Sequence, residues 1–134
     1  MKKFLTVSSL LLVFAGHAAA QSGTLFTNPV IIVSPMTIDF GAVPRHATAT
    51  NTFLVENFGG GTLKGKATVA APFKLIQGAS YSLKKNEAQV VTITYTPTRA
   101  GSDTGTVRFT GGFGAKATVT GRRADAAPNS VEGR

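Results

Sequence analysis

Short runs rich in Val, Ile, Thr, Phe and Tyr, separated by clusters of Gly, Pro, Asn or Lys, recur along residues 21–134. This pattern is typical of strands joined by turns. Within the runs the apolar residues alternate, so that Val91, Ile93 and Tyr95 share one face of the run 89–96. No stretch shows the 3.6-residue period of an amphipathic helix. Parallel sheets need crossover helices, so the pattern predicts an all-β, immunoglobulin-like antiparallel β-sandwich of about seven strands.

The strands are expected in the runs 50–57, 62–70, 73–76, 81–83, 89–96, 106–110 and 115–120, after a first strand over 30–33 and 36–40 that is interrupted at Ser34 and Pro35. The alternation predicts that these side chains face the core: Phe53, Val55, Val91, Ile93, Tyr95, Val107 and Phe109. We interpret Gly59–Gly61 as a hairpin turn, because glycine accepts positive φ without steric cost.

The first 20 residues have the three parts of a secretory signal peptide. Lys2 and Lys3 precede an apolar run over residues 4–16, and Ala18–Ala20 supply the small residues that a signal peptidase needs. The apolar run is shorter than the roughly 20 residues of a membrane-spanning helix. We expect cleavage after Ala20 and a protein exported to the periplasm or the extracellular medium.

The rest of the chain divides into three predicted parts. Residues 21–33 form an N-terminal extended segment or edge strand, and residues 34–121 form the immunoglobulin-like sandwich. Residues 122–134 have no apolar period and are expected to be a flexible C-terminal tail. No second apolar stretch is long enough to predict a membrane span.

The exported chain is basic. Of the 14 Lys and Arg residues two lie within the signal peptide, which leaves 12 cations against six acids and a net charge of +6. The cations occur as separated pairs without the interleaved aromatic residues that stack on bases, which argues against a nucleic-acid partner. A solvated surface is the simpler explanation, and a site for an anionic partner remains the alternative.

The residue inventory excludes most site chemistries. The chain has no Cys, and hence no disulfide, thiol nucleophile or Cys-ligated zinc. His46 is the only histidine after residue 20, and the acids are scattered, so neither a metal site nor a catalytic triad or carboxylate pair is predicted. Gly59–Gly61 lacks the Lys-Ser or Lys-Thr of a phosphate-binding loop. We therefore expect a non-enzymatic protein without a cofactor.

Aromatic residues beside glycine-rich turns are the first candidates for contacts. Phe58 and Phe113 are placed to meet a sugar ring or a partner strand, although folding back over one end of the sandwich is the favoured interpretation. The full set of candidate interaction residues adds the extended segment and one lysine pair: Phe26, Val30, Ile32, Phe58, Phe113, Lys64 and Lys66.

Four segments between Ser34 and Gly121 carry a family resemblance. They are Ser34–Pro44, Val55–Gly59, Pro72–Leu75, and Val91–Pro97 with Gly101 and Gly105–Val107. In this order they resemble the Hydin-type (ASH) domains of the major-sperm-protein-like branch of the immunoglobulin fold, here as a bacterial secreted single-domain version. The resemblance implies a fold and a role in scaffolding or interaction, and it implies no reaction.

Two functions follow as hypotheses. The leading one is a secreted or periplasmic interaction or structural module that contacts an unknown protein partner, or a second copy, through a sheet edge or an end of the sandwich. Deleting residues 21–33 should then abolish association and leave a folded domain. The alternative is a module that binds a carbohydrate or an anionic envelope polymer, and its binding should weaken as salt rises.

Overall fold

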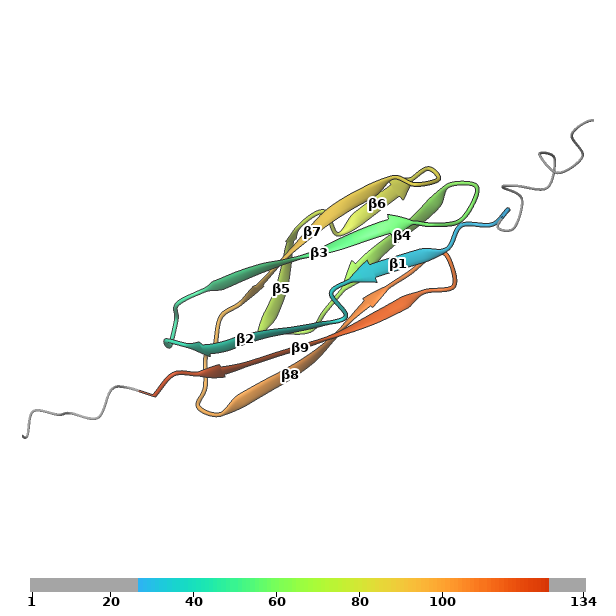
Figure 1. Ribbon diagram of the computed structural model, residues 1–134. Coiled ribbons are helices and arrows are strands. Elements are labelled where there is room, and N and C mark those ends of the chain that lie inside the picture. The colour runs from blue at the N-terminus through green and yellow to red at the C-terminus, as the bar shows by residue number, and fades with distance from the viewer. Residues whose placement is uncertain (1–26, 126–134) are drawn as a thin grey trace, which may run out of the picture.

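The computed structural model describes residues 27–125, which contain nine strands and no helix. The strands are β1 (Ile31–Ser34), β2 (Thr37–Val43), β3 (Ala49–Asn57), β4 (Leu63–Thr68), β5 (Phe73–Gln77), β6 (Ser80–Leu83), β7 (Ala88–Tyr95), β8 (Ser102–Phe109) and β9 (Ala115–Arg123). They form two packed sheets (Figure 1), one with the order β1-β3-β7-β5 and one with the order β2-β9-β8-β4-β6. The signal peptide, Phe26 and most of the predicted tail lie outside the described residues.

The predicted all-β, immunoglobulin-like sandwich is confirmed, and its core contains every side chain that alternation places inward. All seven side chains expected to face inward are buried: Phe53, Val55, Val91, Ile93, Tyr95, Val107 and Phe109. Phe53 and Phe109 meet edge to face across the sandwich, with ring centroids 5.5 Å apart. At the other end the Phe73 and Tyr95 rings stack at 4.9 Å. Period two therefore identifies the interior without any knowledge of strand order.

The first predicted strand is wrong in one respect. Residues 30–33 and 36–40 do not form one interrupted strand, because β1 pairs with β3 in the four-stranded sheet and β2 pairs with β9 in the five-stranded sheet. The chain crosses between the sheets at Pro35, where a strand lacks an N–H to donate. The β2–β9 pairing is parallel, so the sandwich is not wholly antiparallel.

The interpretation of Gly59–Gly61 as a hairpin turn is also wrong. These residues connect β3 with β4, which belong to different sheets, so the segment crosses the end of the sandwich. The residues before β1 pass directly over it. A Cβ atom at Gly59 would lie only 2.2 Å from the backbone oxygen of Asn28, so any other residue would push the two segments apart.

Two boundaries differ from those expected. Ile31 and Val33, which we assigned to the N-terminal segment, are buried in the core. We therefore expect deletion of residues 21–33 to destabilise the domain, contrary to the sequence-based expectation. At the other end β9 continues to Arg123, two residues into the predicted tail, and β8 begins at Ser102 rather than at residue 106.

Candidate interaction surface

The outer face of the four-stranded sheet carries one exposed apolar side chain on each strand. These four residues, which we call the apolar row, are Ile32 on β1, Leu54 on β3, Val90 on β7 and Ile76 on β5, with exposed fractions of 42%, 44%, 52% and 56%. Single exposed apolar residues are common on protein surfaces. A set that spans every strand of one sheet is less common and indicates a contact surface.

The pairing register makes these side chains neighbours. Leu54 lies directly opposite Val90, and Ser34 lies opposite Leu54, so that Ile32 is one diagonal step away. Side chains at such positions in a sheet lie within reach of one another. The register between β5 and β7 shifts between Leu75 and Gln77, and Ile76 is the extra residue of this bulge. A bulge re-aims side chains, and here it leaves Ile76 exposed.

Threonines and two charged residues surround the row on this face. On one side of Leu54 and Val90 the outward positions of β3 and β7 carry Thr50, Thr52, Thr92 and Thr94. On the other side Glu56 lies directly opposite Ile32, whereas Lys74 on β5 pairs with Thr94. Because burying an unpaired charge is costly, a partner that covers the row must either leave Glu56 in solvent at its margin or supply a cation for it.

The two edges of the same sheet are poor templates for a partner strand. β1 has four residues between Pro29 and Pro35, and its Ile31 N–H already donates to the Gly112 oxygen at 3.2 Å. β5 has five residues, follows Pro72 and contains the bulge. Short strands, prolines and bulges are the devices that protect sheet edges from pairing. The structure therefore favours the face of the sheet over its edges.

Several of the predicted interaction residues gather at one end of the sandwich, where β1 begins and the β3–β4 and β8–β9 connections lie (Figure 1). The Phe58 N–H donates to the Val30 oxygen at 2.9 Å, which joins two of them. Phe58 is half exposed, and Phe113, at φ 75° in the β8–β9 turn, is 86% exposed. The expectation that both rings fold back over the sandwich is therefore wrong for Phe113.

The remaining predicted residues within residues 27–125 are divided between the two sheets. Val30 is half-buried just before β1, whereas Ile32 belongs to the row itself. Lys64 and Lys66 are exposed on β4, in the opposite sheet. Sequence reasoning did not select Leu54, Ile76 or Val90 as contact residues. The alternation of their strands was the available signal, but it does not show which outward residues become neighbours.

Asn57, the last residue of β3, fixes this end of the fold. Its side chain is fully buried. The Asn57 oxygen accepts hydrogen bonds from the N–H groups of Val30 and Gly59, and its amide nitrogen donates to the oxygens of Gly61 and Leu83. All of its hydrogen-bonding capacity is thus used to connect β1, the β3–β4 crossing and β6. This junction places Ile32 and Phe58 relative to the sandwich end.

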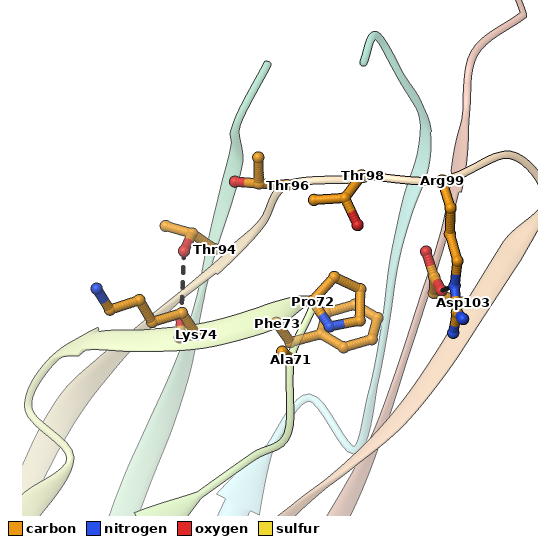
Figure 2. A pocket seen from close by; sticks show the side chains of 9 residues that line it. All are labelled: Ala71, Pro72, Phe73, Lys74, Thr94, Thr96, Thr98, Arg99 and Asp103. Atoms are coloured by element: carbon orange, nitrogen blue, oxygen red, sulfur yellow. Dashed lines mark hydrogen bonds and ion pairs between the residues drawn. The ribbon is translucent and has the colours of Figure 1, made fainter. Parts of the chain in front are cut away.

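A cavity of about 570 Å³ lies beside the start of β5 and the β7–β8 connection. Figure 2 shows its lining residues Ala71, Pro72, Phe73, Lys74, Thr94, Thr96, Thr98, Arg99 and Asp103. Lys74 and Arg99 lie on opposite sides of Pro72 and Phe73 (Figure 2). The Thr94 hydroxyl donates to the Lys74 backbone oxygen at 3.3 Å. The cavity is open to solvent, and its lining contains no pairing of a nucleophile with a base.

The carboxylate of Asp103 at this cavity has a structural partner. It accepts a hydrogen bond from the Tyr95 hydroxyl at 2.8 Å, and the Arg99 Nε atom lies 4.0 Å from its other oxygen. Burial, and then the hydrogen bond and the negative charge of Asp103, raise the pKa of Tyr95 to about 12. Tyr95 belongs to the four-stranded sheet and Asp103 to the five-stranded sheet, so the contact joins the two sheets.

Within residues 27–125 no group of three or more His, Asp or Glu side chains could hold a metal ion. His46 lies in the β2–β3 loop and is exposed. The same part of the chain has no helix that is long and apolar enough to cross a membrane.

Comparison with known proteins gives the family. The fold is similar to the ASH / PapD-like domain of human CEP192 (PapD-like domain 7), with 16% identity, 80% of this chain and 94% of that chain covered, and a TM-score of 0.62. It is also similar to the CupB2 chaperone of Pseudomonas aeruginosa (16% identity, 75% and 59% covered, TM-score 0.56).

A third similar structure is WR4, an MSP family member of C. elegans (12% identity, 71% and 98% covered, TM-score 0.50). Likeness at these identities shows the fold alone, and no curated protein sequence matches the chain. Residues 29–120 match the family described as HYDIN/CFA65/VesB-like, Ig-like domain. Since this match covers most of the chain and agrees with the observed sandwich, the protein belongs to the HYDIN/CFA65/VesB-like Ig-like domain family.

Proposed function

We propose that this protein is an exported, non-catalytic interaction module that binds a protein partner through the outer face of its four-stranded sheet. The apolar row carries the proposal: four apolar side chains, each about half exposed, lie across all four strands of one face. Removing apolar surface from water stabilises a contact by roughly 25 cal/mol per Å². The threonines around the row add hydrogen-bonding groups at its margin without adding charge.

The similar structures support a binding role in general. The family match concerns an immunoglobulin-like domain, and two of the similar structures, CupB2 and the E. coli protein DraB, are chaperones, which act on other proteins. This chain shares their fold, and its partner is defined only by the chemistry of its surface. A flat apolar face without a deep cleft fits another flat apolar surface, such as a sheet of a second protein or of a second copy.

Export is part of the proposal and rests on the first 20 residues. The expected mature protein begins at Gln21 and is found outside the cytoplasm. N-terminal sequencing of the protein recovered from the periplasmic fraction and from the medium tests this directly. Recovery of the intact chain from the cytoplasm alone would contradict it.

Site-specific photocrosslinking in the producing cells tests the contact surface. A photoreactive amino acid at Leu54 should give a discrete crosslinked product, because Leu54 lies in the middle of the apolar row. The matched control is the same amino acid at Thr104, an exposed outward position of β8 on the opposite sheet. A product with twice the mass of the chain identifies a second copy, and any other discrete product identifies a different protein.

The proposal fails if Leu54 gives no product while the exported protein is present and photoactivated. It also fails if Leu54 and Thr104 give the same products, because the contact would then have no preference for a face.

A further inference from the structure

The outer face of the five-stranded sheet has a different character from the apolar row. Outward positions of three adjacent strands carry four exposed cations, which we call the cationic cluster: Lys64 and Lys66 on β4, Arg108 on β8 and Lys116 on β9. Arg108 lies directly opposite Lys116 and is paired on its other side with Thr68, two residues after Lys66. With strands about 4.8 Å apart, these charges occupy one corner of the sheet.

The cationic cluster lacks internal compensation. Like charges directly opposite each other on neighbouring strands destabilise a sheet, and Arg108 and Lys116 are such a pair. In residues 27–125 the ion pair that forms is between Arg99 and Asp103, at a different part of the molecule. Asp39 is the nearest outward carboxylate by register, opposite Thr120, and it accepts hydrogen bonds from Gly41 and Thr120. An anion from outside would relieve this repulsion.

An apolar cavity adjoins the two opposed cations. It has a volume of about 500 Å³ and lies against the β8–β9 turn, and its lining includes Arg108, Lys116 and the exposed side chains of Met36 and Phe113. This volume is within the range of small-ligand sites. A cavity that offers an aromatic ring beside cations suits a sugar ring that carries a carboxylate or a sulfate, since the ring contacts the C–H face and the guanidinium pairs with the anion.

We propose that this corner of the five-stranded sheet binds an acidic polysaccharide, with Arg108 and Lys116 pairing with its anionic groups and Phe113 contacting a sugar ring. Lys64 and Lys66 then attract the next charged residues of the polymer. The outward hydroxyls of Thr106 and Thr118, opposite each other along the same face, extend the surface with groups that hydrogen-bond to sugar hydroxyls.

The geometry distinguishes this ligand from other anions. β8 and β9 are interior strands with neighbours on both sides, so their backbone groups are not offered to an acidic peptide strand. Single-stranded nucleic acids are bound through several aromatic platforms for base stacking, and this corner exposes the single ring of Phe113 among the described residues. What the face does offer is cations, hydroxyls and one ring. This site is separate from the proposed protein contact, because the apolar row lies on the opposite sheet.

Titration of the exported protein with an oligomer of alginate, a polyuronate, tests the proposal. Isothermal calorimetry should show binding that weakens steeply between ~50 mM and ~200 mM salt, because the contact is electrostatic. Replacing both opposed cations, as Arg108→Gln/Lys116→Gln, should weaken binding at least about tenfold. Phe113→Asn should weaken it less, and asparagine tolerates the positive φ of that position.

The matched control is Arg45→Gln/Lys85→Gln, which makes the same change in net charge at two exposed loop positions. It should bind alginate as the unmodified protein does, to within about threefold. Thermal unfolding of each variant confirms that the sandwich is intact. The same titrations with dextran, an uncharged polysaccharide, and with poly-glutamate, an acidic polypeptide, test whether binding needs both charge and a sugar ring.

The proposal is overturned by any of four results: absence of alginate binding at ~50 mM salt, equal affinity for dextran, an equal loss in the control double variant, or tighter binding of poly-glutamate than of alginate. The last result would assign the corner to an acidic protein segment.

Discussion

The two outer faces of the sandwich share one core and differ in the apolar and charged side chains that they expose. The four-stranded sheet presents the apolar row and threonines to solvent, together with Glu56 opposite Ile32 and Lys74 on β5. The five-stranded sheet turns Lys, Arg, Ser and Thr outward and carries no exposed large apolar side chain along β4, β8 and β9. Outward positions contribute little to packing, so they are free to match what each face meets. This contrast is the basis of the two contact surfaces that we propose.

Two buried side-chain hydrogen bonds, one near each end, join the two sheets of the scaffold that carries both faces. The Asn57 amide donates to the Leu83 oxygen of β6, and the Tyr95 hydroxyl donates to Asp103 of β8. Because each contact joins one sheet to the other, removing it should disturb both faces together. Changes at an outward position should instead affect only its own face.

The largest expected effect is that of Asn57→Ala. The substitution leaves the N–H groups of Val30 and Gly59 and the oxygens of Gly61 and Leu83 without their partner. Buried groups that lose their hydrogen bonds are costly, and we expect the free energy of unfolding to fall by about 3 kcal/mol. Urea unfolding measures the change. The control Asn51→Ala, at an exposed position of β3, should cost less than about 0.5 kcal/mol.

An equal loss in Asn57→Ala and Asn51→Ala would show that the junction does not hold the sheets together, and the two faces would then be structurally independent at this end.

The second effect is that of Tyr95→Phe, with a pH signature. The lost hydrogen bond to Asp103 should cost about 1–2 kcal/mol near neutral pH. The pKa of Tyr95 is raised from 10.0 to about 12, so the folded state favours the neutral phenol. This stabilisation is complete below pH 10 and is lost as the pH rises through about 12. The free energy of unfolding should therefore decline more steeply between these pH values in the unmodified protein than in Tyr95→Phe.

Parallel decline of the two proteins over that pH interval would mean that Tyr95 does not carry the alkaline sensitivity, and the contact with Asp103 would lose its support as a connection between the sheets.

The third prediction separates the faces directly. Leu54→Lys places a charge in the middle of the apolar row, which a partner then has to desolvate. With the photoreactive amino acid at Ile76, the yield of crosslinked product should fall at least about tenfold. The matched variant Thr104→Lys, outward on the opposite sheet, should leave the yield unchanged. An equal fall in both variants would point to net charge rather than to the face.

The smallest effect concerns the like-charge pair in the cationic cluster of the five-stranded sheet. Lys116→Glu converts the repulsion with Arg108 into attraction, and we expect a stabilisation of about 0.5 kcal/mol at low salt. The gain should shrink as salt rises, because both groups are exposed. Thermal unfolding at two salt concentrations measures it. Thr118→Glu, opposite Thr106, is the control, and a gain there as large as at Lys116 would argue against a local pair.

Much of the fold could be predicted because burial follows the period of two. Phe53, Val91 and Val107 were assigned to the core from alternation alone, and all three are buried. Alternation also places Leu54 and Val90 on outward positions. It could not show that they lie opposite each other, because the two strands are more than 30 residues apart in the chain and only the pairing register brings them together.

The candidate surfaces were less predictable for the same reason. Lys64 and Lys66 were singled out as a pair, but Arg108 and Lys116 join them only because β8 lies between β4 and β9. The bulge that exposes Ile76 depends on its pairing with β7, and bulges leave little trace in a single sequence. The exposure of Phe113 follows from a positive φ in a turn rich in glycine, where the side chain has no neighbouring strand to cover it.

The sequence by itself determined the class of the fold, seven residues of its core and the absence of cysteine chemistry, because these depend on residue type and local period. Only the tertiary structure decided the crossing at Pro35, the parallel pairing of β2 with β9 and the composition of the two faces. A proline indicates that one backbone N–H is missing from the hydrogen bonds between strands, but it does not show whether the chain continues in the same sheet. Neighbours across a sheet are set by strand order and register, which are properties of the whole folded chain.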